Sequence, residues 1–194
     1  QSRSSAASDV YKRQNSGCNN FAGGQCALYN NWGGCDNTAI GQKALYTNTT
    51  GCNNVAIGAN ALCKNTTAQN NQAIGANAMV NNTTGQYNVS IGRYTLGSNT
   101  DGDYNTGIGY LALRCNTTGC KNTGIGYGSL FNNRTGHYNT SFGWESLYLA
   151  NSGDDNFAAG QCALYNNYGG CDNTAIGQQA LYSNTTGDNN ISLG

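Results

Sequence analysis

Hydrophobic and polar residues follow a pattern that returns every 17 residues from Asn20 onward. Ten full copies follow one another without insertion or deletion, and NISLG begins an eleventh. Each copy is numbered here so that Asn20 is position 1. Position 1 is then always Asn, position 5 is always Gly, position 4 is mostly Ile, and position 9 is Leu or Met in all ten full copies. A strict period of this kind predicts stacked, equivalent units rather than one globular core.

Each copy contains two short apolar segments separated by turn residues. The N-x-A-I-G segment at positions 1–5 is expected to form a strand with the position-4 Ile facing inward, and positions 7–10 a second strand with Leu facing inward. The N-T-T-G segment at positions 12–15 is typical of a turn whose Gly has a positive φ, and the Gly at position 5 marks the other corner. Stacking at about 4.8 Å would align these residues in columns. The sequence therefore predicts an all-β fold, a single-chain parallel β-solenoid of about ten coils with 17 residues per coil.

The invariant Asn of position 1 has a physical explanation in such a stack. Side-chain amides in register can donate to one neighbour and accept from the other, which forms a ladder. The alternative is a set of independent turn asparagines. The predicted ladder comprises Asn20, Asn37, Asn54, Asn71, Asn88, Asn105, Asn122, Asn139, Asn156, Asn173 and Asn190.

A longer period lies above the 17-residue one. The copy at 20–36 returns almost unchanged at 156–172, and the copy at 37–53 returns at 173–189, an offset of 136 residues or eight coils. We therefore expect residues 15–194 to be a little over one unit of a longer array. Neither end of this array carries the polar cap that a free-standing solenoid needs, so we expect a longer native polypeptide or ends that join other subunits.

Residues 1–14, QSRSSAASDVYKRQ, fit none of the repeat. The string has no apolar segment of the kind found in signal peptides, and it resembles translated sequencing-adapter read-through. We expect a non-native leader, with a disordered native leader as the alternative.

Composition excludes several classes of function. Charged residues make up 9% of the chain and the formal net charge is zero, so no basic surface favours nucleic acid. No apolar run approaches the length that spans a membrane, so membrane insertion is not expected. One histidine, His137, and one glutamate, Glu145, provide no repeated acid–base or nucleophile arrangement. We therefore expect neither an enzyme nor a bound metal or cofactor.

Nine cysteines in so polar a chain favour an oxidising, extracellular compartment. The repeat suggests disulfides within single coils and, once, between adjacent coils, with Cys18 left over. The candidate pairs are Cys26–Cys35, Cys162–Cys171, Cys115–Cys120 and Cys52–Cys63. Five of the nine cysteines share position 16, where stacked neighbours would also lie within disulfide range, so Cys18–Cys35 or Cys35–Cys52 is the competing connectivity.

Asn-x-Ser/Thr sequons recur at position 12, which the repeat places on an exposed turn. In a eukaryotic secreted protein these asparagines would be glycan acceptors, so covalent glycans are possible partners. The alternative is that Asn-Thr-Thr-Gly is simply a good turn. The candidates are Asn48, Asn65, Asn82, Asn116, Asn133 and Asn184.

Aromatic residues gather at positions 6 and 10 of the repeat. We expect them to stack on one another at or near the surface, where they could contact sugars or neighbouring filaments, although cross-coil packing alone is the more common role.

The N-[TV]-A-I-G core resembles the head repeat of trimeric autotransporter adhesins (YadA-like heads), and also repeats of bacteriophage tail fibres. The match spans residues 15–194 but rests on five positions, and the 17-residue period is longer than is usual for the head family. The resemblance implies a left-handed solenoid with an adhesive or structural role.

The leading functional expectation is a structural subunit or segment of an extracellular filament or surface fibre, which self-associates end to end or laterally. An adhesin head or a phage tail-fibre receptor-binding module is the alternative. Ice binding is a third possibility, although the threonines of the repeat are adjacent and lie in the predicted turns.

Overall fold

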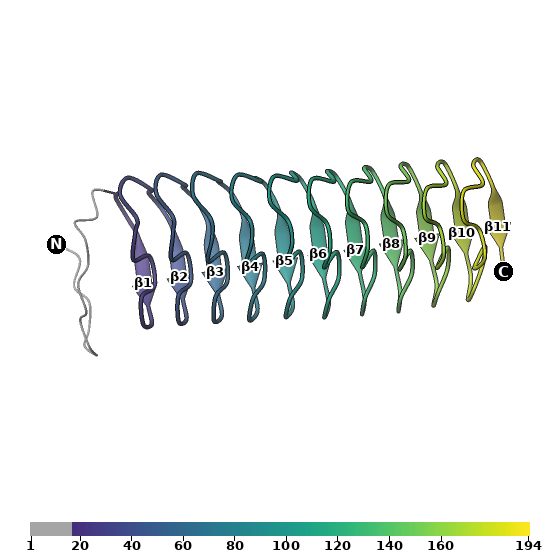
Figure 1. Cartoon of the computed structure of the whole chain (residues 1–194). Helices are drawn as coiled ribbons and strands as arrows, with labels where there is room; N and C mark the ends of the chain where they lie inside the picture. The colour runs from purple at the N-terminus through teal and green to yellow at the C-terminus, as the bar shows by residue number, and fades with distance from the viewer. Residues whose placement is uncertain (1–16) are drawn as a thin grey trace.

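The protein is a β-solenoid of short, parallel strands in a computed structural model that describes residues 17–194. The strands form one sheet in chain order, from β1 to β11, so each strand between these two pairs with the strands of the preceding and following coils (Figure 1). The predicted fold class is confirmed, and the expected leader at 1–14 lies outside the described residues. The strands are β1 Phe21–Gly23, β2 Thr38–Ile40, β3 Val55–Ile57, β4 Gln72–Ile74, β5 Val89–Ile91, β6 Thr106–Ile108, β7 Thr123–Ile125, β8 Thr140–Phe142, β9 Phe157–Ala159, β10 Thr174–Ile176 and β11 Ile191–Leu193.

The register between coils is 17 residues throughout. Ala39 lies opposite Ala22 on one side and Ala56 on the other, and every other strand pair keeps the same offset. Like residues therefore lie over like residues along the whole rod, as the period predicts.

Each coil contains one strand, so the predicted second strand at positions 7–10 is wrong. Positions 7 and 9 adopt left-handed backbone, with φ of 55° at Lys43 and 50° at Leu45, and this conformation interrupts an extended segment. The Lys43 N–H donates to Gln25 of the preceding coil at 2.9 Å, whereas the Leu45 N–H donates to Ala61 of the following coil at 3.0 Å. The turn is thus hydrogen-bonded to both neighbours without being a strand.

The strand turns its smallest side chain inward. Ala39 at position 3 is fully buried, while Ile40 at position 4 is 40% exposed, so the predicted inward orientation of the Ile column is wrong. The lumen is narrow, because it already holds the position-9 Leu column and the small position-8 residues. A position-3 Ala, Ser or Gly fits beside these side chains, and strand alternation then places position 4 outside.

One pair of neighbouring coils matches a larger interior residue with a smaller one. Thr95 takes the place of Ala at position 8, and the next coil carries Gly107 at position 3, where an added Cβ would lie 2.6 Å from the Thr95 Cγ2. The larger residue on one coil is therefore matched by the smallest on the next, as close packing requires.

The two recurrent glycines have different roles. Gly41 at position 5 has a φ of 129°, which only Gly adopts readily, so this corner is as predicted. Gly51 at position 15 is not in the left-handed region, and the expectation of a positive φ there is wrong. Gly51 instead allows close stacking, because a Cβ on it would lie 2.3 Å from the Ala68 carbonyl oxygen.

Candidate functional site

The position-1 asparagines form a buried ladder, which confirms the prediction. Oδ1 of Asn37 accepts from the Asn54 backbone N–H at 3.0 Å and from Asn54 Nδ2 at 3.1 Å. Nδ2 of Asn37 donates across its own coil to the Gly51 carbonyl at 2.8 Å. From Asn37 to Asn173 these asparagines are at most 1% exposed, so an uncharged polar column lies inside the solenoid.

Position 12 carries a second ladder where the sequence predicted an exposed turn. Nδ2 of Asn48 donates to Asn31 Oδ1 at 2.6 Å and to the Gly51 carbonyl at 2.9 Å. Asn48, Asn65, Asn82, Asn116 and Asn133 are fully buried, and Asn184 is partly buried. The prediction that these six sequon asparagines are exposed is wrong. Both N–H groups of the Asn48 amide are already in use, so a glycan on this nitrogen would break a buried hydrogen bond.

The two ladders meet at the position-15 carbonyl. The Gly51 oxygen accepts from Asn37 and from Asn48, and this arrangement recurs in other coils, for example at Gly119. Within residues 17–194 no buried side-chain nitrogen or oxygen lacks a hydrogen-bond partner. The amides of the two ladders are thus occupied in holding the coil, and they are not free to bind a ligand.

The outer face of the sheet is the main candidate for a functional surface. It consists of positions 2 and 4 of every strand, which we call the outer sheet face. No residue at either position is charged in any of the eleven strands. Position 2 is mostly Thr, Val or Phe. Five position-4 residues are between 36% and 44% exposed: Ile40, Ile74, Ile91, Phe142 and Ile176.

Sequence reasoning missed this surface because it assigned the Ile column to the core. A signal was present, however, because position 3 is always Ala, Ser or Gly. A residue that is small in every copy marks a crowded interior, and the strand period of two then assigns the larger neighbour to the outside.

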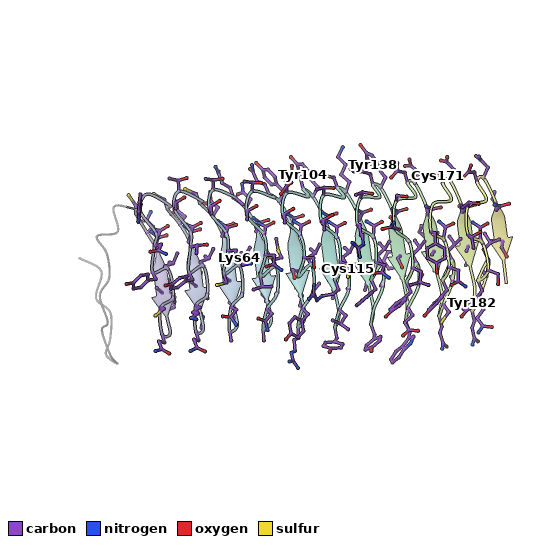
Figure 2. All side chains as sticks on the ribbon, in the orientation of Figure 1. Lys64, Tyr104, Cys115, Tyr138, Cys171 and Tyr182 are labelled. Carbon is purple, nitrogen blue, oxygen red and sulfur yellow. The ribbon has the colours of Figure 1, made fainter. Side chains whose placement is uncertain are left out.

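The position-16 cysteines lie in one column along the rod axis. The Cys18 N–H donates to Cys35 Sγ, and the Cys35 N–H donates to Cys52 Sγ, both at 3.1 Å. The pKa of Cys18 is raised. The main cause is a side-chain hydrogen bond with Cys35, and the second is charge repulsion between the two thiolates. All nine cysteines are free thiols in the described structure, so the within-coil pairs and the Cys52–Cys63 pair between coils stay predictions. Figure 2 places Cys171, at position 16, on the upper edge of the coil and Cys115, at position 11, nearer its middle.

The same column continues as a row of hydrogen-bond acceptors. The Asp103 N–H donates to Cys120 Sγ, the Cys120 N–H to His137 Nδ1, and the His137 N–H to Asp154 Oδ1. His137 therefore uses Nδ1 for a backbone contact and does not form a nucleophile–base–acid arrangement. Over residues 17–194, no group of three or more His, Cys, Asp or Glu side chains is placed to hold a metal ion.

Aromatic stacking at positions 6 and 10 is confirmed. Tyr127 stacks on Trp144 at 4.2 Å between ring centroids, and a continuous position-10 column joins Phe131, Tyr148, Tyr165 and Tyr182 at 4.8–5.2 Å. Partial burial, more than the nearby Glu145 charge, raises the pKa of Tyr148. Stacked rings present their edges to solvent, so these columns stabilise neighbouring coils rather than offering an open aromatic platform.

A further aromatic column at position 17 was not predicted. Tyr87 and Tyr104 stack in parallel, and two coils farther along the rod axis Tyr138 pairs with Lys121. Only three copies have an aromatic residue here, so no repeat-wide pattern revealed it.

One surface hollow adjoins the turns, lined by Asn132, Arg134, Leu149, Asn151 and Tyr168. Arg134 is its single charged side chain, and no acid or base faces it from the lining. A cation without such a partner does not make a catalytic arrangement.

No helix in residues 17–194 has the length and apolar character needed to cross a bilayer. No family model, curated protein or solved structure matches the chain, so functional inference rests on the geometry of these columns and of the outer sheet face.

Proposed function

We propose that this chain is a structural segment of an extracellular fibre that associates laterally with other copies through its outer sheet face. The observation that carries the proposal is a solvent-facing, uncharged and partly apolar surface along all eleven strands. Exposed strand faces are normally kept soluble by charged residues, and contiguous apolar surface is a feature of protein–protein contacts.

The repetition of the outer sheet face supports another copy of this chain as its partner. Because the columns at positions 2 and 4 repeat in every coil, two copies present matching rows of side chains to each other. The area buried would rise in proportion to the number of coils in contact, so many weak contacts add to one stable association. The backbone groups of β2 to β10 are already paired with strands on both sides, and lateral contact would therefore be made by side chains.

An extracellular location is part of the proposal. The nine cysteines and the low proportion of charged residues support it. Glycans at position 12 are not part of it, because those asparagines are buried.

An adhesin head or a tail-fibre module is a second candidate, supported by the same surface. In that case the outer sheet faces of three chains would enclose a closed apolar core instead of extending into an open lateral array. The N-T-A-I-G resemblance favours the closed form, whereas the long cysteine-rich repeat favours the open one.

The number of chains per particle distinguishes these candidates. We expect the purified chain to form elongated assemblies in negative-stain images and to sediment as a concentration-dependent series of species. Ile91→Lys places a charge on the outer sheet face and should give dispersed single rods. Thr84→Lys, on an exposed turn away from this face, is the matched control and should assemble like the wild type.

Circular dichroism would show that both variants keep the fold. A discrete three-chain particle would favour the adhesin-like candidate. A wild-type chain that stays monomeric at all accessible concentrations would contradict both proposals.

A further inference from the structure

Tyr87 and Tyr104 form an exposed, parallel ring pair on consecutive coils. Their ring centroids are 4.9 Å apart, the ring planes differ by 1°, and the residues are 48% and 53% exposed. Both occupy position 17, so the 17-residue register places equivalent ring atoms over each other.

The backbone fixes this geometry. The Tyr87 N–H donates to the Gln69 carbonyl at 3.2 Å, and the Tyr104 N–H donates to the Gln86 carbonyl at 3.0 Å. Both residues have nearly the same left-handed φ, 56° and 57°, so the two side chains leave the coil in the same direction. The approach of the rings is therefore set by the solenoid and does not depend on chance encounter.

The pair is isolated within its column. Position 17 is Asn70 in the coil before Tyr87 and Lys121 in the coil after Tyr104. Lys121 turns to the other side, because its Nζ donates to the Tyr138 hydroxyl at 2.9 Å and lies 4.8 Å from that ring centroid. Tyr138 is equally exposed at 52% but has no tyrosine above or below it.

We propose that Tyr87 and Tyr104 are a site of oxidative cross-linking, at which a peroxidase-type one-electron oxidant supplied with hydrogen peroxide joins the two rings as dityrosine. Each phenol loses one electron and one proton to give a phenoxyl radical. The radicals couple through a new bond between ring carbons ortho to the hydroxyls, and the coupled rings then tautomerise to restore both phenols. The two electrons and two protons reduce one hydrogen peroxide to two waters, so the reaction balances.

Other stacked tyrosines are less suited to this reaction. Tyr29 and Tyr46 are 5.3 Å apart with a 10° angle between their planes, and both are half-buried against the coil. An enzyme-sized oxidant reaches Tyr87 and Tyr104 more easily, because both residues are about half exposed. Figure 2 shows Tyr104 projecting from the upper edge of the coil. The product would join two coils covalently along the rod axis. The proposed cross-link does not depend on the proposed lateral assembly.

The test is to treat the dilute purified chain with a haem peroxidase and hydrogen peroxide and to map the products by mass spectrometry. Trypsin cleaves after Arg93 and Arg114, so the cross-link would join the peptide ending at Arg93 to the peptide ending at Arg114, with loss of two hydrogen atoms. Fragment ions assign the second ring, because the latter peptide also contains Tyr94 and Tyr110. The product should appear in the monomer fraction, together with dityrosine fluorescence.

Two conservative variants serve as matched tests. Tyr104→Phe keeps a stacked ring but removes one phenol, and it should abolish the linked peptide. Tyr138→Phe removes an equally exposed phenol from the same column and should leave the linked peptide at the wild-type yield. Circular dichroism checks that both variants remain folded.

The proposal is overturned if Tyr87 couples no more readily than Tyr138, or if its dityrosine joins separate molecules. Persistence of the linked peptide in Tyr104→Phe, which would assign the bond to Tyr94 or Tyr110, would also overturn it.

Discussion

Asn88 makes two hydrogen bonds to a single atom of Asn71: its backbone N–H and its Nδ2 both donate to Asn71 Oδ1, at 3.0 and 3.2 Å. The same side chain of Asn71 donates through its own Nδ2 to the Gly85 carbonyl at 2.9 Å. One amide thus joins a coil to the next and also spans its own coil. This explains why position 1 accepts no other residue in eleven copies.

Replacing Asn71 by Ala should destabilise the solenoid by about 1–3 kcal/mol, because the buried Asn88 N–H would lose its acceptor. The measurement is the free energy of unfolding from urea denaturation. Gln69→Ala, two residues away at an exposed site, is the control and should change stability little. Equal losses in the two variants would show that the Asn column does not stabilise the stack.

Mild oxidation should form a disulfide along the axis, between Cys35 and either Cys18 or Cys52, because these thiols occupy one column. Neighbouring strands lie about 4.8 Å apart, which is within the Cα separation of disulfides. Peptide mapping distinguishes the connectivities, since trypsin cleaves after Lys43 and separates Cys35 from Cys52. Chymotrypsin cleaves after Phe21 and Tyr29 and separates Cys18, Cys26 and Cys35 from one another. Cys35→Ser should block both products and Cys120→Ser neither. A mapped Cys26–Cys35 bond would support the within-coil connectivity instead.

Tyr148 should make stability fall at alkaline pH. Its pKa is raised, first by burial and then by the charge of Glu145, so the folded chain holds this phenol proton more tightly than the unfolded chain does. The resulting stabilisation is fully present below the unfolded pKa of about 10 and is lost as pH rises through the folded value. Urea midpoints measured across this range should fall less steeply for Tyr148→Phe than for the wild type. Parallel curves would rule out this contribution.

Much of the fold follows from the sequence. The period fixes the number of coils and the register. The invariance of position 1 correctly indicates a ladder, because an amide in register can donate to one copy and accept from the next. These features depend only on which residues recur, and not on how any side chain is oriented.

The orientation of the strand was harder to predict. A period of two separates Ala39 from Ile40 but does not say which faces inward, and the usual preference for burying Ile gave the wrong answer. The width of the lumen decides which of the two residues faces inward, and this width depends on how Leu45 and its neighbours pack in three dimensions. The surface that we propose for assembly was therefore assigned to the core.

The prediction that position 12 is exposed was wrong for a related reason. Asn48 begins an Asn-Thr-Thr-Gly segment that reads as an ordinary surface turn, yet the coil folds its amide inward to the Gly51 carbonyl. The Asn-Thr-Thr-Gly segment is compatible with a turn whether its Asn is exposed or buried. Only the repetition of Asn in nine of ten copies hinted at a buried partner.

The constant 17-residue register affects how the length of the repeat array can change in evolution. Because every coil contacts its neighbours through the same positions, a whole coil can be gained or lost while the remaining coils keep the same kinds of contact. Unequal recombination between gene segments that encode similar coils, such as residues 20–53 and 156–189, would thus change the length of the rod in one step. Length is then a trait that can vary between closely related lineages without any compensating substitution.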